Sequence, residues 1–417
     1  MAVRQLLVGV CVCAAAVQSV FAQEPALTVD QAVNEAIDHN LALVAERYNL
    51  RVAEAAVITA GLRPNPVLTV GVFKPQGTLQ GQGLSTQDES VRGDYLFERG
   101  GKRRLRVESA DAARSVTELQ LQDTIRRLRL DVELACTEVQ LAQENVQLAR
   151  DNLAAFTGVV DVNRERVRAG DLAEVEFQRS RLASIQFQND VKQQEAHLQT
   201  ARARLAQLLA RAAGAPLPSI AGEMRHDAAA LDIDALRQKA DAARPDLLAA
   251  RRDQARSVAE TRLQLANGKV DLTVSGEYHR QLAAGVDGGA AAAFVSVPLP
   301  LFSRNQGEIA RARQQQQQAD ARARALSSAV STEVVTAYTD YTTNRDIVAS
   351  IERDMLQQAS DVRSATEYSY RRGEASFVEF LDAVRAFNET MQSYHAAQAD
   401  YARSLYTLES LAGEVRP

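Results

Sequence analysis

The sequence predicts a mainly α-helical chain with four membrane β-strands, organised as two tandem repeats, three copies of which close into a helical tube and a β-barrel. Three observations predict this class. The chain repeats itself at an interval of about 204 residues. Each copy contains one helical stretch much longer than a globular domain needs. Each copy also contains two strands of a length that can cross a bilayer.

The N-terminus has the pattern of a secretory signal peptide. Arg4 precedes an apolar run from Leu6 to Val17, and the small-residue motif Val20-Phe21-Ala22 follows it. This pattern predicts cleavage after Ala22, so that residues 1–22 are removed during export. Whether the mature N-terminus carries a lipid stays open.

Composition excludes several classes of protein. Cys11 and Cys13 lie in the signal, so Cys136 is the only cysteine of the mature chain and no internal disulfide is expected. The formal net charge of -5 gives no indication of a nucleic-acid partner. Beyond the signal no apolar run reaches the ~18 residues of a membrane-spanning helix, so any membrane crossing is expected to use strands.

The internal repeat is marked by matches that keep their order along the chain. Leu68-Thr69-Val70 recurs as Leu272-Thr273-Val274, and GDLAEVEF, from Gly170 to Phe177, recurs as GEASFVEF, from Gly373 to Phe380. Because the interval is kept across helix, strand and turn, we interpret the matches as a duplication. The expected division is a signal peptide over 1–22, a first repeat over 23–213, an inter-repeat linker over 214–232 and a second repeat over 233–417.

Each copy begins with a helix and a β-hairpin. The first helix is expected to open near Thr28, where TVDQ has the pattern of a capping box, and to run until Pro64. Strands are expected from Val70 to Lys74 and, after a polar loop, in RGDYLFER (92–99). In the second copy the alternation is cleaner, and a partner strand ends at the PLP motif. There Val270, Leu272, Val274, Gly276 and Tyr278 face one way, whereas Asp271, Thr273, Ser275, Glu277 and His279 face the other.

A long helix follows each hairpin. Residues 102–169 contain no proline and one glycine, and residues 308–372 contain neither. At about 1.5 Å per residue each helix would extend roughly 100 Å, which suits a structure that bridges a periplasm. Gly170 and Gly373 end these helices, and return helices are expected over 171–213 and 374–412.

The first long helix carries two apolar stripes, about 200° apart around its axis. Two stripes indicate a neighbour on each side, as in the wall of a tube, whereas a two-stranded coiled coil needs one. The second long helix shows one stripe clearly. The main seam is Ile125, Val132, Val139, Val146 and Leu153 with Leu128, Ala135, Ala142, Ala149 and Phe156; the opposite stripe is Leu134, Leu141 and Leu148; and the seam of the second helix is Val334, Tyr341, Val348 and Met355.

The strands require an assembly of several chains. Four strands cannot lie in lipid as an open sheet, because the N–H and C=O groups of the edge strands would be unsatisfied. Three chains would give a twelve-stranded barrel, with the helices closing into a tube on the same axis.

Three short runs, together with the repeat, carry a resemblance to a known family. They are RPNP (63–66), GGKRRLR from Gly100 to Arg106 and PLPLFSRNQGEIARA from Pro298 to Ala312. With them the mature chain resembles the outer-membrane efflux factors, the TolC-like trimeric channel-tunnels, and the last two runs are most similar to the heavy-metal, CzcC-like branch. The resemblance implies an outer-membrane channel extending into the periplasm. It would passively carry substrates, here heavy-metal cations, delivered by an inner-membrane RND-type pump through a periplasmic adaptor protein.

The resemblance also implies a site at the two glycine turns. They would be the periplasmic tips of the helix pairs, where the tube narrows and docks on its partners. The second tip carries the family's two acidic positions, here Glu379 and Asp382, which share a helix face and would ring the mouth with carboxylates that attract cations. The alternative is an ordinary solvated helix face. The residues carried over for the turns and for adaptor docking are Gly170, Gly373, Val175, Glu176 and Val378.

A gate is the other feature that the resemblance implies. Tyr370 matches a tyrosine that helps to hold family entrances closed, and its alternative role is packing between helices. Where the family has a gate arginine this chain has Ala375, for which Arg371 and Arg372 are candidate substitutes. The first tip has Arg179 at the position of Asp382, so the acidic pair is not expected to repeat there.

No enzymatic site is expected. The five histidines are scattered without metal-binding spacing, and no Gly-rich phosphate loop precedes a helix, so no catalytic residue, cofactor or resident metal is predicted. Two alternatives to metal efflux are kept: efflux of drugs or other small organic molecules, and a periplasmic coiled-coil structural protein without a pore.

Overall fold

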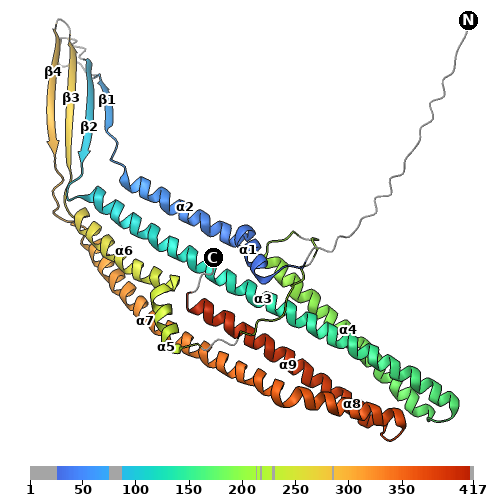
Figure 1. Cartoon of the computed structure of the whole chain (residues 1–417). Helices are drawn as coiled ribbons and strands as arrows, with labels where there is room; N and C mark the ends of the chain where they lie inside the picture. Colours follow the sequence, from blue (N-terminus) through green and yellow to red (C-terminus); the bar gives the residue numbers. More distant parts are fainter. Residues whose placement is uncertain are drawn as a thin grey trace, which may run out of the picture.

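The computed structural model describes residues 26–74, 87–212, 214–216, 218–227, 231–283 and 286–413. The chain is elongated, with four strands at one end and a row of long helices running away from them (Figure 1). The predicted signal peptide lies outside the described residues.

The first repeat begins with two helices, not with the one helix that the sequence predicted. Thr28 and Gln31 form the predicted capping box, with Thr28 N–H donating to Gln31 Oε1 at 2.9 Å and Gln31 N–H to Thr28 Oγ1 at 3.2 Å. Asn40 then adopts an extended conformation, and its side chain accepts hydrogen bonds from the N–H groups of Ala42 and Leu43. A new N-cap therefore interrupts the helix. The elements are α1 (Val29–His39), α2 (Leu41–Gly61), β1 (Val67–Phe73), β2 (Gln87–Phe97), α3 (Lys102–Ala169) and α4 (Glu174–Leu208).

The second repeat follows the same order, with one difference inside its long helix. Its elements are α5 (Ile233–Ala243), α6 (Pro245–Asn267), β3 (Leu272–Ala283), β4 (Val286–Ser296), α7 (Gln306–Ser350), the π-helical segment η1 (Ile351–Met355), α8 (Leu356–Arg372) and α9 (Phe377–Leu411). The predicted uninterrupted α-helix over 308–372 is thus helical throughout but contains a π turn.

The π turn changes which residues form the buried stripe. Val334, Tyr341 and Val348 are buried as predicted, but Met355 is 45% exposed, so its assignment to the seam was wrong. Leu356 packs instead against the cluster that contains Tyr341. A π turn accommodates one extra residue, and the apolar stripe accordingly continues one position later than a strict heptad requires.

The four strands form one antiparallel sheet in the order β1-β2-β3-β4. The register pairs Val70 with Val91 and Val91 with Tyr278, which places apolar side chains on one face. The other face is polar: Arg92 donates to Asp94 Oδ1 at 2.9 Å and to Ser275 Oγ at 3.2 Å. This register confirms the two predicted faces of the third strand, because residues paired across antiparallel strands point to the same side.

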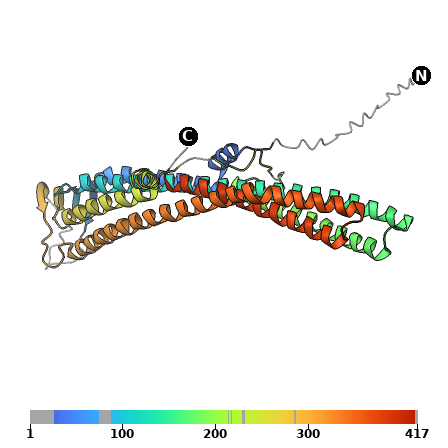
Figure 2. The same cartoon turned by 60° about the horizontal axis from the view of Figure 1, so that its bottom comes forward.

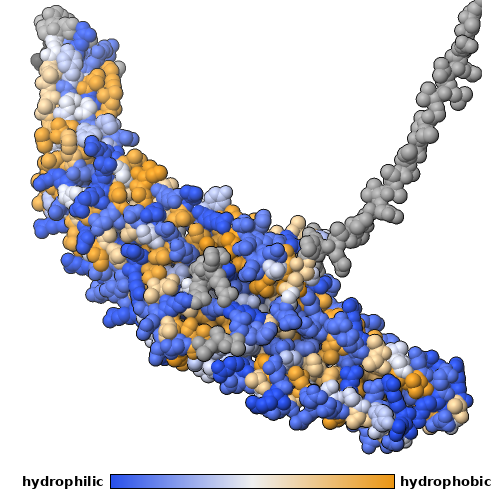
Figure 3. Space-filling view, viewed as in Figure 1, coloured by the Kyte–Doolittle hydropathy of each residue, from blue (hydrophilic) through white to orange (hydrophobic). Residues whose placement is uncertain are grey.

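The helices form a thin, gently curved layer (Figure 2). Near the sheet, α3 lies between α2 and α6, and α6 packs against α7; farther away, α3 lies between α4 and α9, and α9 packs against α8. This arrangement confirms that the first long helix has a neighbour on each side. Hydrophobic and hydrophilic residues are interspersed along the visible face of the layer (Figure 3). No helix among the described segments combines the length and apolar character needed to cross a membrane.

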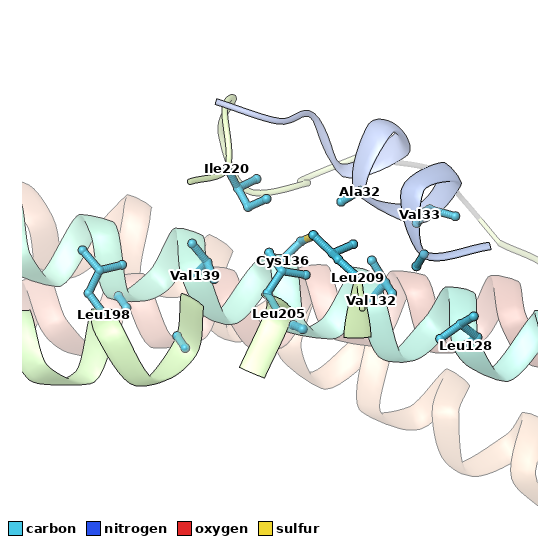
Figure 4. Close-up of a cluster of buried hydrophobic side chains, with 14 of the residues drawn as sticks. Ala32, Val33, Leu128, Val132, Cys136, Val139, Leu198, Leu205, Leu209 and Ile220 are labelled. Carbon is cyan, nitrogen blue, oxygen red and sulfur yellow. The ribbon is translucent and has the colours of Figure 1, made fainter. Parts of the chain in front are cut away.

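The largest buried cluster anchors α1 to the middle of the long helices. Val132 and Val139 of α3 meet Ala32 of α1, Leu205 of α4 and Ile220 of the linker (Figure 4). Cys136 lies in this cluster with no exposed surface. The predicted main seam is therefore buried here from Leu128 to Val146, which sets the orientation of the middle part of α3.

Candidate functional site at the helix tips

The two glycine turns lie at the end of the chain farthest from the sheet (Figure 1). Gly170 ends α3 with φ 85° and Gly373 ends α8 with φ 80°, the left-handed conformation that glycine adopts without strain. In each turn the glycine N–H donates back to the helix, from Gly170 to Val167 O at 3.0 Å and from Gly373 to Tyr370 O at 3.0 Å. The two copies of the motif thus make the same helix stop.

Aromatic side chains fill the space between the two tips. Tyr370 stacks on Phe380 with ring centroids 5.1 Å apart, and Phe380 stacks on Phe156 of α3 at 6.1 Å. Phe377 meets Tyr370 and Phe156 edge-on, at 6.1 Å from each. Phe177, the first copy's equivalent of Phe380, packs at the border of the same cluster. The repeated phenylalanine therefore holds the two helix pairs of one chain together.

Tyr370 links the second tip to α3 by a buried hydrogen bond. It is 4% exposed, and its hydroxyl donates to Asn163 Oδ1 at 2.8 Å. The Arg166 guanidinium lies 5.9 Å from the centre of the Tyr370 ring. Burial raises the pKa of Tyr370, so the hydroxyl stays protonated and able to donate. These contacts join two segments of one chain, and the role of Tyr370 in closing an entrance stays a prediction.

Glu379 has a local task at the start of α9. Ser376 N–H donates to Glu379 Oε2 at 2.7 Å, and Glu379 N–H donates to Ser376 Oγ at 3.3 Å, which completes a capping box. The hydrogen bonds from the Ser376 backbone and hydroxyl lower the pKa of Glu379, so this exposed carboxylate is ionised at neutral pH. Asp382 is exposed one turn later and makes no hydrogen bond or ion pair within the described part of the chain. The pair thus combines one anchored and one free carboxylate on a single helix face.

The first tip differs in charge but shares the exposed valine. Glu176 forms an ion pair with Arg179 at 2.9 Å, so the carboxylate of this tip has a cation beside it. Val175 and Val378 occupy equivalent positions in the two motifs and are both exposed. The two turns therefore offer similar apolar corners and different charges to whatever contacts them.

The candidate substitutes for the gate arginine are both held within α8. Arg371 donates to Glu367 Oε1 at 2.6 Å, and the Arg372 guanidinium lies 4.5 Å from the centre of the Tyr368 ring. Ala375, at the position of that arginine, is partly buried against the aromatic cluster. Its small side chain lets the turn close onto these rings.

Sequence reasoning missed two features of this site. Asn163 falls seven residues after Phe156, at a seam position that is otherwise apolar, and a polar residue on a seam is a recognisable signal for a specific partner. The second feature is the capping box, whose sequence signal is the motif Ser376-x-x-Glu379. Among the described residues no group of His, Cys, Asp or Glu is arranged to hold a metal ion.

Comparison with known proteins places this fold. The family model described as outer membrane efflux protein matches the chain twice, over residues 32–211 and 236–414. The chain is 25% identical to the cobalt-zinc-cadmium resistance protein CzcC of Cupriavidus metallidurans, an alignment covering 94% of this chain and 92% of that protein.

Solved structures share the same architecture. CusC, whose structures concern folding and transmembrane channel formation, matches with a TM-score of 0.77 at 18% identity over 93% of this chain and 92% of its own. The open state of the Neisseria gonorrhoeae outer-membrane channel MtrE matches with a TM-score of 0.74 at 17% identity over 92% and 88%. With a family model that covers both repeats and a fold shared with such channels, the chain belongs to the outer membrane efflux protein family and is an outer-membrane protein that extends into the periplasm.

Proposed function

We propose that three copies of this chain form the outer-membrane channel of a tripartite efflux system, a passive path for heavy-metal cations. The cations would arrive from an inner-membrane RND-type pump through a periplasmic adaptor protein. The observation that carries the assembly is an exposed coiled-coil stripe on α2 that no other described segment of the chain covers. The substrate class rests on the similarity to CzcC.

The α2 stripe has the spacing of a helix–helix seam. Its members are exposed, and after a first interval of seven residues they follow one another at intervals of three or four residues. They lie on the side of α2 opposite the one that packs on α3. Tyr48 and Val52 are 68% and 67% exposed. An apolar stripe of this length on a water-exposed helix face marks a site of protein–protein association. Its members are Leu41, Tyr48, Val52, Ala55, Thr59 and Leu62.

The opposite edge of the layer offers a complementary surface. There α7 exposes small side chains, Ala321, Ala325, Ser328 and Thr332, on the side away from α6. Large residues on one edge and small residues on the other favour a head-to-tail contact between copies, which closes into a ring when the rotation permits. In one chain β1 and β4 each have a free edge in the sheet, and the same ring would pair them.

The assembly is tested by a charge placed on the stripe. Val52→Glu is expected to abolish the trimer in detergent-extracted protein, measured by native mass spectrometry, because the glutamate would be buried at the contact without a partner. The matched control is Arg51→Glu, one residue away and off the stripe. A trimer that survives Val52→Glu unchanged would contradict the proposed seam.

The substrate is tested in cells. A strain that lacks this chain is expected to become sensitive to cobalt, zinc or cadmium salts and to regain resistance with the wild-type chain. Sensitivity to drugs alone would replace the substrate class and leave the channel intact. Planar-bilayer conductance of the purified trimer is the parallel measurement, and a chain that never conducts would favour a structural coiled-coil protein.

A further inference from the structure

All four connections between the sheet and the helices meet at one level of the molecule (Figure 1). They are residues 60–66, 97–104, 268–272 and 297–306. Their bases outnumber their acids. The bases are Arg63, Arg99, Lys102, Arg103, Arg104, Lys269 and Arg304, and the acids are Glu98 and Asp271.

Both acids are already engaged by basic residues at the start of α3, Lys102 and Arg106. Asp271 accepts from Lys102 Nζ at 2.7 Å and from the Arg99 N–H at 2.8 Å. Glu98 is held by the Arg106 guanidinium through both of its oxygens. Arg106 also donates to the Leu62 carbonyl at 3.2 Å, which ties the end of α2 to α3. These contacts hold the junction together and neutralise the charges of its two carboxylates.

Five exposed cations at this level have no carboxylate partner among the described residues, and Arg103 of these donates to the Gly61 carbonyl at 2.6 Å. The other four are here called the basic collar: Arg63, Arg99, Lys269 and Arg304. The Arg304 Nε donates to the Pro300 carbonyl at 3.2 Å, and this is the one hydrogen bond of its guanidinium among the described residues. Each of the four connections contributes one member. The collar therefore belongs to the junction as a whole. In a ring of several chains each chain would contribute one such set of cations at the same level.

Exposed apolar side chains alternate with the collar. Leu299 is 76% exposed and Phe302 is 92% exposed, two residues before Arg304. Leu62, next to Arg63, is exposed as well. A hollow of about 420 Å³ is lined by Leu299 together with Lys269 and Arg304, and a second hollow, of about 490 Å³, is lined by Arg63 among others. Aromatic and aliphatic groups next to cations are the composition that settles at a membrane–water interface.

We propose that the basic collar binds the phosphate headgroups of anionic phospholipids in the membrane leaflet that faces the periplasm. Phosphate oxygens accept the guanidinium and ammonium donors, and the acyl chains cover Leu299 and Phe302. A soluble polyanion would satisfy the charges and leave these apolar side chains in water, so lipid is the occupant that fits both. The proposal rests on the proposed function, because it needs the sheet to lie in the membrane.

The experiment measures headgroup preference in bilayers of stated composition. Wild-type protein is reconstituted into nanodiscs of phosphatidylcholine with one-quarter phosphatidylglycerol, and the lipids retained by the released trimer are counted by native mass spectrometry. Phosphatidylglycerol is expected to be enriched among them, and the enrichment is expected to fall as salt rises, because screening weakens exposed charges. The variant R63Q/R99Q/K269Q/R304Q is expected to lose the enrichment by about tenfold.

The control variant removes four exposed cations elsewhere, R181Q/K192Q/R252Q/R322Q, and is expected to keep the enrichment. Wild-type protein that inserts, trimerises and conducts but retains lipids in the bulk proportion would overturn the collar and leave the proposed function standing. Protein that never inserts or trimerises would overturn both. The wild-type salt titration decides the question even if the quadruple collar variant does not fold, since a salt-independent enrichment would also refute headgroup binding.

Discussion

Tyr370→Phe is expected to loosen the contact between the two helix tips of each chain. The Tyr370 hydroxyl is the one hydrogen-bond partner of the Asn163 carboxamide among the described residues, and Asn163 has no exposed surface. Without the hydroxyl, neither the oxygen nor the nitrogen of this buried amide is satisfied. Such a loss costs about 1–3 kcal/mol, which corresponds to roughly 5- to 150-fold in the equilibrium for opening the tip.

Amide hydrogen exchange measures this opening directly. Peptides that cover the end of α8 and the start of α9 are expected to exchange faster in Tyr370→Phe than in the wild type, by a factor within that range. In single-channel recordings the open fraction is expected to rise, if the tips hold the mouth closed. Tyr368→Phe is the matched control. It lies two residues away, is exposed, and its hydroxyl makes no hydrogen bond among the described residues, while a phenylalanine ring keeps a face for Arg372.

A rescue variant sharpens the test. Replacing both partners, with Tyr370→Phe and Asn163→Leu together, removes the orphaned amide and is expected to recover most of the protection, because the pair is then apolar on both sides. Equal exchange in Tyr370→Phe and Tyr368→Phe would refute the reasoning. So would a double variant that exchanges as fast as Tyr370→Phe alone, since the unsatisfied amide would then not be the cause.

Three further predictions concern charge, pH and reactivity. Glu379→Gln with Asp382→Asn is expected to reduce the cation preference of the channel, measured as the reversal potential in a salt gradient. Glutamine at position 379 keeps the capping box. An unchanged reversal potential would show that neither residue sets the cation preference. Burial lowers the pKa of His395 below its ordinary 6.5, so the unfolded chain takes up the proton first and the thermal midpoint is expected to fall as pH drops below 6.5. His395→Gln should flatten that part of the pH profile, and an unchanged profile would contradict the assignment. Burial raises the pKa of the Cys136 thiol to about 12, so a maleimide reagent is expected to add mass to the denatured chain and not to the folded trimer.

Much of the architecture was accessible from the sequence because long-period signals determine it. The first long helix begins and ends at the predicted residues, Lys102 and Ala169, since nothing between them breaks a helix and Gly170 stops it. The strand faces followed from alternation, and the neighbours on both sides of α3 followed from its two stripes. In each case many residues report on one structural property, and errors at single positions average out.

The features that sequence reasoning missed depend on one or two residues. The break at Asn40 arises from a single side chain that caps α2, within a stretch that reads as one helix. The π turn at Ile351–Met355 contains neither glycine nor proline, and it shows only as a one-residue slip of the apolar stripe. At the tips, the pairing of Tyr370 with Asn163 joins residues in different repeats, which no local pattern specifies. The motif identified Glu379 but did not predict its hydrogen bonds to Ser376.

The π turn has a consequence for symmetry. Among the described residues only the second repeat contains a π turn. In a trimer the helix pairs between this level and the tips would therefore be of two kinds, alternating around the axis. The far end of a trimer would then present three pairs of unlike helix tips, one tip of each pair bearing Glu176 beside Arg179 and the other Glu379 with Asp382. Adaptor subunits that dock on these ends would therefore contact two different surfaces in turn.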